Sequence, residues 1–343
     1  MTTTAAQTHL VNKVKSLRGY YHIDTQTVFE LRLELATPLV ISESKADIPV
    51  PGLPNLDGIL QFAAFYWCVM EASATYPELS DDYLWQVNEA LRNPDRSWID
   101  FPIPLHEISI RNTGIGKSQR LYDCSVGLPV DPESAEVVYP IGNEFLDAQG
   151  KRLKAVVDNI PLRRRSVDPQ HCHKQIALTA KFDSRRGAHK ALDNRMYHLV
   201  TGEYCFYFRG DRVWVDRLLR VMQDNGVGIG KKSGLGYGQI NQIHIYPSPQ
   251  VKPTLGYLLT TAQKKALNVS SDTRSIALLK NIPTDELFRW CATGDSNNQT
   301  LFGDTALKIL SIVPTLAGYT PPHWLKKNQA LVARYGSLLY GTS

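Results

Sequence analysis

The segment from Gly226 to Gly238 constrains the fold more than any other feature considered, because six of its thirteen residues are glycine. Glycine lets a chain adopt positive φ and lets a bulky anion approach the backbone closely. Lys231, Lys232 and Ser233 stand inside the segment, where they can reach a phosphate. The segment follows a predicted helix and precedes a predicted strand, whereas nucleotide-binding glycine loops run from strand to helix. This order favours a loop that follows a polynucleotide backbone, with a glycine-rich hairpin that binds nothing as the alternative.

Two stretches match nucleotide-binding motifs in part, and both lack a required glycine. A P-loop needs a glycine, four further residues and then Gly-Lys-Ser/Thr. Lys231 stands where the second glycine belongs, and Arg111 holds the first glycine position ahead of Gly116-Lys117-Ser118. The segment also has no Gly-x-Gly-x-x-Gly at the required spacing. The sequence therefore predicts neither ATP nor NAD as a ligand, and no other cofactor.

The composition is that of a water-soluble globular protein of 343 residues, with 43% hydrophobic and 21% charged residues. No apolar run reaches the ~18 residues that a membrane span needs. The longest run, Ile59 to Met70, is interrupted by Gln61, and the first ten residues lack the layout of a signal peptide. The sequence thus predicts a protein without membrane contact. The cysteines are odd in number and scattered, which predicts a protein of the reducing cytoplasm and not a disulfide scaffold. They are Cys68, Cys124, Cys172, Cys205 and Cys291.

Positive charge is concentrated in one segment of the chain. Between Lys151 and Lys190 there are eleven Lys/Arg and three Asp, a net charge of +8. The whole chain carries +5, so the rest of it carries −3. Such asymmetry is typical of a phosphate-rich partner, although a solvated basic surface without a partner would look the same.

The candidate RNA contacts are basic, hydroxyl and aromatic side chains from three regions. Arginine grips phosphate in a bidentate manner and stacks on bases, and tyrosine offers a stacking face. The predicted contacts are Lys231, Lys232, Ser233 and Tyr237 of the glycine-rich segment, Arg163, Arg164, Arg165, Lys174, Arg185 and Arg186 of the basic segment, and Lys117 and Arg120 of another glycine-containing loop.

Hydrophobic periodicity predicts an α+β core of the ferredoxin-like type. Residues 28–35 alternate like a half-buried antiparallel strand, and residues 56–74 form an apolar helix that Asn55 or Asp57 can cap. Further along, the pattern predicts strand 204–208, a turn with a helix cap at Gly210-Asp211, and helix 213–222 with Val215, Leu218, Leu219 and Met222 on one face. Strand 239–246 follows. Two such strand–helix units build the predicted core.

The predicted domain organisation has four parts. Residues 20–100 and 191–247 form the two halves of the core, and a weaker helical pattern spans 81–91. Residues 101–190 have poor periodicity and are interpreted as a long basic insertion with short strands rather than a compact core. Residues 248–343 are interpreted as a C-terminal extension with helical patches.

No catalytic or metal site follows from residue spacing. His171-Cys172-His173 has no second pair of zinc ligands elsewhere in the chain. A metal-independent ribonuclease needs a general base beside a cation, and nothing in the sequence fixes a partner for a histidine. The candidates by residue type are His22, His106, His171, His173 and His189.

Several motifs together resemble the RAMP superfamily of CRISPR-associated proteins. The glycine-rich segment, at the end of a β-α-β unit, is similar to the glycine-rich loop of the superfamily, and it follows Phe208-Arg209-Gly210-Asp211 and a helix. Thr37-Pro38-Leu39-Val40 followed by Pro54 to Leu60 resembles the start of the first helix in type IV Cas-five-like subunits. Gly318 to Trp324 resembles their C-terminal proline–tryptophan motif. The matches cover residues 28–325 with gaps.

The resemblance implies a modified RNA-recognition-type core with an inserted thumb, here within 101–190. Such a subunit caps the 5′ handle of the CRISPR RNA in a multisubunit surveillance complex and is not known for catalysis. Its implied partners are a Cas-seven-like backbone subunit, the large subunit and the target DNA duplex near the flanking motif. Lys231, Lys232 and Ser233 would contact handle phosphates. The alternatives are a CRISPR RNA-processing endoribonuclease of the same superfamily, a different backbone subunit, or a protein-only scaffold.

Overall fold

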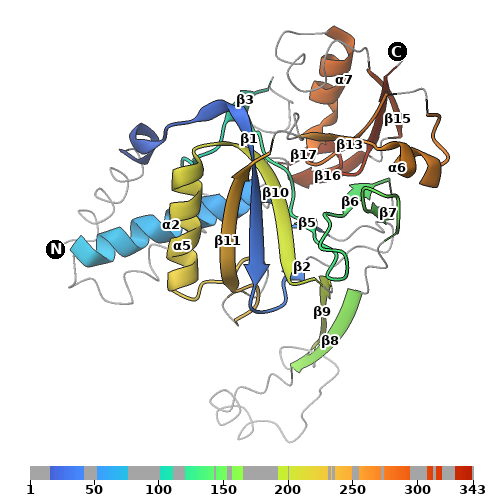
Figure 1. The fold of residues 1–343 in the computed structure, drawn as a ribbon. Helices are drawn as coiled ribbons and strands as arrows, with labels where there is room; N and C mark the ends of the chain where they lie inside the picture. The colour runs from blue at the N-terminus through green and yellow to red at the C-terminus, as the bar shows by residue number, and fades with distance from the viewer. Residues whose placement is uncertain are drawn as a thin grey trace, which may run out of the picture.

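The chain folds as a mixed α+β structure in which antiparallel sheets predominate (Figure 1). The computed structural model describes residues 16–41, 52–75, 101–110, 120–142, 144–152, 157–164, 192–199, 201–230, 233, 236–248, 255–271, 274–293, 307–311, 314–318 and 329–341. The predicted helix at 81–91 lies outside these ranges. No helix within them is both long and apolar enough to cross a membrane.

The main sheet has the strand order β11-β1-β10-β5, and every neighbouring pair is antiparallel. Helix α2 follows β1, and helix α5 connects β10 to β11. Along the chain, the strands and helices of this unit therefore run strand, helix, strand, strand, helix, strand. Their bounds are β1 Asp24–Leu35, α2 Leu56–Thr75, β5 Leu128–Pro129, β10 Glu203–Gly210, α5 Arg212–Asp224 and β11 Ile240–Pro247.

The central strand β1 alternates as its sequence predicts. Phe29, Leu31 and Leu33 are buried, whereas Glu30 and Arg32 are half-buried on the other face. The buried row packs against helices α2 and α5 and against Phe208 and its neighbours on β10. Because side chains alternate along a strand, one face of the sheet holds the core and the other is polar.

Helix α5 shows why the chain turns at the end of β10. The side chain of Asp211 accepts hydrogen bonds from the backbone N–H groups of Val213 and Trp214, which satisfies two donors at the helix start. The four residues predicted to share one face, Val215, Leu218, Leu219 and Met222, are all buried. The predictions for this turn and this helix are confirmed.

The described residues within 101–152 pack into the core instead of standing apart from it. Ile103, Leu105, Val126 and Leu128 are almost fully buried in the same cluster as β1. The expectation of an insertion without a compact core is wrong for this part, although the domain boundaries themselves stay a prediction. Sequence periodicity missed the packing because these strands are very short: β3 Glu107–Ser109, β4 Arg120–Tyr122, β6 Tyr139–Ile141 and β7 Glu144–Leu146.

Beyond residue 255, the chain forms two further antiparallel sheets around a second buried cluster, and not mainly helical patches. The sheet orders are β12-β13-β18-β15 and β14-β17-β16. The bounds are β12 Gly256–Leu258, α6 Thr261–Ala266, β13 Arg274–Leu278, β14 Ile282–Pro283, α7 Thr284–Thr293, β15 Leu307–Ser311, β16 Pro314–Gly318, β17 Gln329–Ala333 and β18 Leu338–Gly341.

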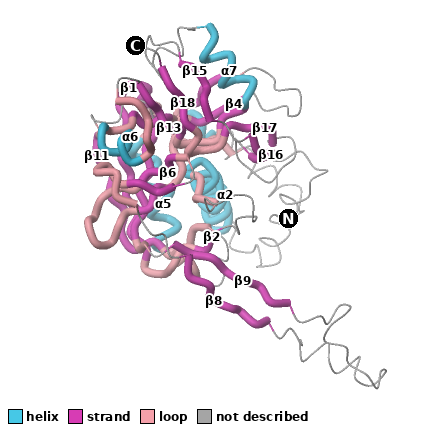
Figure 2. The backbone as a smooth tube through the Cα atoms, turned by 90° about the vertical axis from the view of Figure 1, so that its right-hand side faces the viewer, coloured by secondary structure: helices cyan, strands magenta, loops and turns pink. Residues whose placement is uncertain are grey.

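A long hairpin leaves the body of the molecule at one end of the main sheet. Strands β8 (Val157–Arg164) and β9 (Leu192–Leu199) pair along their whole length, and β9 also pairs with β2 (Val40–Ile41). Figure 2 shows the two strands extending away from the rest of the described chain. Strand β8 lies inside the predicted thumb region, 101–190, whereas β9 lies just beyond its end.

A buried ion pair joins the C-terminal sheets to the core. Lys280 Nζ lies 2.5 Å from Asp57 Oδ2 and 3.3 Å from the sulfur of Cys124, and all three side chains are buried. Asp57 belongs to the first turn of α2, and Lys280 follows β13. Burial alone would lower the pKa of the Lys280 ammonium, but the Asp57 carboxylate reverses this and raises the pKa to about 12. Burial raises the pKa of the Cys124 thiol to about 12, so the thiol is neutral.

We expect Lys280→Met to destabilise the fold by about 3–5 kcal/mol, because it leaves the Asp57 carboxylate buried without its counter-charge. The double change Asp57→Leu with Lys280→Met removes both charges and should restore most of the lost free energy of unfolding. Chemical denaturation of the three proteins measures this. Lys265→Met, at an exposed position of α6, is the control and should change the free energy by about 0.5 kcal/mol or less. A single variant as stable as the wild type would contradict this role.

Candidate nucleic-acid interface

The glycine-rich segment lies at the end of the main sheet where β1 ends and where β10 and β11 begin. It connects the end of α5 to the start of β11. Antiparallel pairing of β1 with both neighbours brings Leu35, Glu203 and Ile240 to this end. The predicted order of helix, loop and strand is confirmed.

The glycines let two stretches of the loop pass each other at very short range. An ideal Cβ at Gly228 would lie 2.0 Å from the carbonyl oxygen of Tyr237, and one at Gly238 would lie 2.2 Å from that of Ile229. Gly226, Gly230, Gly236 and Gly238 all have positive φ. The loop can therefore close only with glycine at these points.

The loop is held against the turn that follows β1. The Thr37 hydroxyl donates to the Gly236 carbonyl at 2.8 Å and accepts from the Gln239 N–H at 2.9 Å. The Gly238 N–H donates to the Pro38 carbonyl at 3.0 Å. At Gly230, a Cβ would lie 2.5 Å from Leu39 Cδ1. The loop is therefore fixed by side-chain and backbone contacts on two sides.

Several backbone donors that could have faced an anion are already used inside the protein. The N–H groups of Gly226, Val227, Ile229, Gly236 and Gly238 donate to carbonyl groups of Gln223, Met222, Gly238, Ser233 and Pro38. At these positions the glycines serve close packing, as the hairpin alternative predicted, and not the binding of phosphate by the backbone. These five N–H groups are therefore not available to bind a phosphate.

The structure brings the base of the β8–β9 hairpin to the same end as the glycine loop. Gly230 approaches the carbonyl of Val40, and Val40 pairs with His198 of β9. Arg163 and Arg164 pair with Asp193 and Leu192 at the end of the hairpin farthest from β2. Two regions of the predicted interface, far apart in sequence, are thus joined through the short strand β2.

The other predicted contacts fall in three places. Ser233 and Tyr237 are half-buried in the glycine loop. Arg120 lies on β4 at the opposite end of the sheet, about 20–25 Å away by the length of β10, with its Nη1 3.5 Å from Glu107 Oε1. The structure therefore does not bring Arg120 to the glycine loop. Lys231, Lys232, Arg165, Lys174, Arg185, Arg186 and Lys117 lie outside the described residues.

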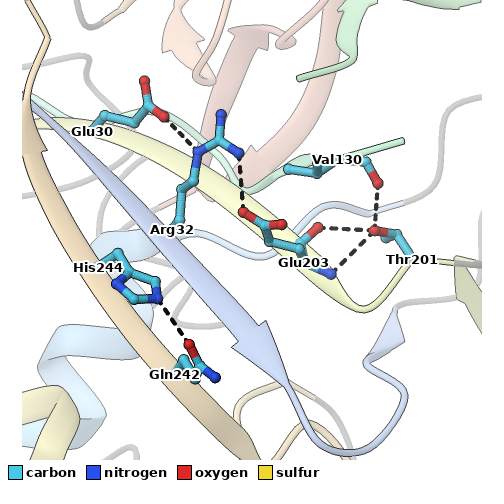
Figure 3. Close-up of polar contacts among 7 residues, drawn as sticks. All are labelled: Glu30, Arg32, Val130, Thr201, Glu203, Gln242 and His244. Carbon is cyan, nitrogen blue, oxygen red and sulfur yellow. Dashed lines mark hydrogen bonds and ion pairs between the residues drawn. The ribbon is translucent and has the colours of Figure 1, made fainter. Parts of the chain in front are cut away.

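The polar face of the main sheet is unsuited to phosphate. Arg32 Nε lies 2.7 Å from Glu30 Oε1, and its Nη1 lies 3.2 Å from Glu203 Oε1 (Figure 3). Burial opposes the charged form of Arg32, but the hydrogen bond and charge of Glu30, with Glu203, raise its pKa above the usual value. One arginine between two carboxylates leaves this cluster with a net negative charge, which repels a phosphate backbone.

One histidine has a partner that the sequence could not reveal. His106 Nδ1 lies 3.7 Å from Asp123 Oδ2, and Arg209 Nη1 lies 2.7 Å from the same oxygen. Asp123 is 1% exposed, whereas the His106 side chain is 33% exposed. Backbone hydrogen bonds from His106 to Arg209 and from Asp123 to His106 hold these three residues together across separate strands. Because they are far apart in sequence, no spacing pattern could have found them.

A cleft of about 460 Å³ lies at the start of α5. Asp211, the predicted cap, is one of its lining residues, and its Oδ2 accepts from the His22 N–H at 2.7 Å. The aromatic wall of Tyr20 and Trp214, with ring centroids 6.0 Å apart, was not predicted. Tyr20 comes from an N-terminal stretch whose polar composition does not indicate packing.

Within the described ranges, no three or more His, Cys, Asp and Glu side chains are grouped so that they could hold a metal ion. His171-Cys172-His173 lies outside those ranges. No protein-family model matches this chain, and no curated protein matches it either.

We expect Gly238→Ala to destabilise the protein by at least about 2 kcal/mol more than Gly236→Ala. Both positions have positive φ, so the backbone cost is shared. Only at Gly238 does a Cβ meet backbone, since nothing lies within 4 Å of one at Gly236. Thermal or chemical unfolding of both variants measures the difference. Equal losses would mean that the loop does not close as described.

Proposed function

We propose that this protein is a non-catalytic CRISPR RNA-binding subunit of a type IV CRISPR surveillance complex, and that it caps the 5′ handle of the guide RNA. The Cas-seven-like backbone subunit, the large subunit and the target duplex near the flanking motif are its proposed neighbours. The observation that carries the proposal is the meeting of the glycine loop with the base of the β8–β9 hairpin at one end of the sheet.

The topology supports the finer fold assignment in this proposal. Numbered within the unit, β11, β1, β10 and β5 are the fourth, first, third and second strands of a strand–helix–strand–strand–helix–strand chain. This order is the one expected of a ferredoxin-like unit, and it therefore supports the proposed RNA-recognition-type RAMP core. The glycine-rich loop lies between the second helix and the fourth strand of this unit.

The distribution of charge supports one path for the RNA. The segment from Lys151 to Lys190 carries a net charge of +8, and strands β8 and β9 border most of it. The polar sheet face, by contrast, carries Glu30, Arg32 and Glu203. A ribose-phosphate chain is attracted by the former and repelled by the latter, so we place the handle along the hairpin and the glycine loop.

This proposal predicts that Lys231→Gln with Lys232→Gln weakens the binding of single-stranded RNA and flattens its salt dependence. Each lost phosphate contact should reduce the slope of log K against log salt by about 0.7, so the pair should reduce it by about 1.4. Fluorescence anisotropy at several salt concentrations measures the slope.

The matched control is Lys264→Gln with Lys265→Gln, a second adjacent lysine pair on the last turn of α6. It removes the same charge from the C-terminal part of the chain and should leave the slope within error of the wild type. If both double variants change the slope equally, general charge and not the glycine loop governs binding.

A second candidate function, RNA cleavage by an endoribonuclease of the same superfamily, is favoured by the geometry of His106. Its Nδ1 faces Asp123 while part of the ring is exposed, and Arg209 supplies a nearby cation. A base at this position could accept the 2′-hydroxyl proton, after which the 2′-oxygen attacks phosphorus and the 5′-oxygen leaves.

Incubation of labelled repeat RNA with the protein in EDTA distinguishes the two functions. Under the leading proposal, RNA is retained intact by the wild type and by His106→Ala alike. Cleavage by the wild type that His106→Ala abolishes, while binding survives, would replace the leading proposal with the second.

A further inference from the structure

Strand β11 forms one edge of the main sheet. It pairs with β1 on one side, and no described strand pairs with its other side. Its sequence, INQIHIYP, contains no Lys, Arg, Asp or Glu. Natural edge strands are commonly protected by charges against pairing with another chain. This edge lacks that protection over residues 240–247.

The pairing with β1 determines which backbone groups point outward. The Ser248 N–H donates to the Val28 carbonyl, so residues 248 and 28 form a hydrogen-bonded pair. Hydrogen-bonded pairs alternate with non-hydrogen-bonded pairs along an antiparallel ladder. The register therefore directs the backbone N–H and carbonyl groups of Gln242, His244 and Tyr246 toward β1. The N–H and carbonyl groups of Ile243 and Ile245 consequently face outward.

The outward-facing backbone groups at the two ends of the strand, Pro247 and Asn241, are complementary in their hydrogen bonding. Pro247 has no N–H to donate. The Asn241 carbonyl already accepts a hydrogen bond from the Gln223 side chain of α5. If Pro247 lies opposite Asn241, the Asn241 carbonyl therefore does not need the N–H that Pro247 lacks.

From this complementarity we propose that β11 pairs antiparallel with β11 of a second copy of this chain, with His244 opposite His244 on the two-fold axis. Ile243 of each copy then exchanges both hydrogen bonds with Ile245 of the other. Pro247 falls opposite Asn241, where no donor is needed. The same patch meets itself, as an isologous interface requires, and the two four-stranded sheets become continuous.

The exposed side chains of the edge fit the same register. Tyr246 is 51% exposed, and its ring stacks near that of His244 on the polar face. In the proposed pairing, Tyr246 lies opposite Gln242 of the second copy, so a large ring is partly covered by an uncharged side chain. No Lys, Arg, Asp or Glu side chain of one strand lies opposite another across the axis. The inference concerns the free chain and does not rest on the proposed function.

A charge-swap experiment at His244 tests the pairing. Sedimentation of the wild type from about 1 to 100 µM should show a reversible shift from the monomer mass of 38.5 kDa to twice that mass. His244→Glu or His244→Lys alone should weaken the dimer about tenfold or more, because like charges then face each other. His244→Gln should keep it. An equimolar mixture of the Glu and Lys variants should restore the dimer, since residue 244 faces only itself.

Amide hydrogen exchange of the wild type tests the same register without any substitution. The Ile243 and Ile245 amides should become protected as concentration rises, whereas those of Gln242 and His244 should be protected at all concentrations. A wild type that stays monomeric over the whole range, a dimer unaffected by His244→Glu, or concentration-independent exchange at Ile243 and Ile245 would each overturn the proposal.

Discussion

The contact between the Lys280 ammonium and the Asp57 carboxylate determines how the C-terminal sheets are placed against the core. Two buried charges are tolerated only as a pair, so the first turn of α2 and the segment after β13 must be placed together. Backbone contacts reinforce this junction, since the Val126 N–H donates to the Leu279 carbonyl at 2.8 Å. The C-terminal sheets are therefore an integral part of the core and not an appendage to it.

A series of contacts connects this buried ion pair to the candidate interface. Helix α2 packs against the buried face of β1, and β1 leads directly into Thr37, which holds the glycine loop. Tyr139 and Tyr257 stack with centroids 3.7 Å apart, and Tyr139 contacts Tyr207 of β10, so the C-terminal region also covers part of the opposite sheet face. Because of this coverage and the carboxylates around Arg32, we propose that RNA binds at the end of the sheet and not on its face.

Local patterns predicted the elements whose side chains repeat at a regular interval. The alternation in β1, the four-residue face of α5, the strand around Phe206 and the Asp211 cap are all confirmed. Such patterns record which side of an element is buried, and they need no knowledge of the partner.

What could not be predicted depends on partners far apart in sequence. The short strands of 101–152 are held by contacts such as that between Ser125 and Tyr207, and two- or three-residue strands carry no period. Lys280 and Asp57 are 223 residues apart, and a lone lysine in a sequence gives no sign of burial. The glycine loop was found by composition, but its internal hydrogen bonds, which limit the role of its backbone in binding phosphate, appear only in three dimensions.

The most direct test of the account is to map where RNA contacts the protein. Ultraviolet crosslinking of bound single-stranded RNA, followed by mass spectrometry of the crosslinked peptides, locates the contact without any substitution. The account predicts crosslinks in the glycine loop, residues 226–238, and in the hairpin region, residues 151–199. Crosslinks confined to His244 and Tyr246 on the sheet face, or none in either predicted segment, would contradict it.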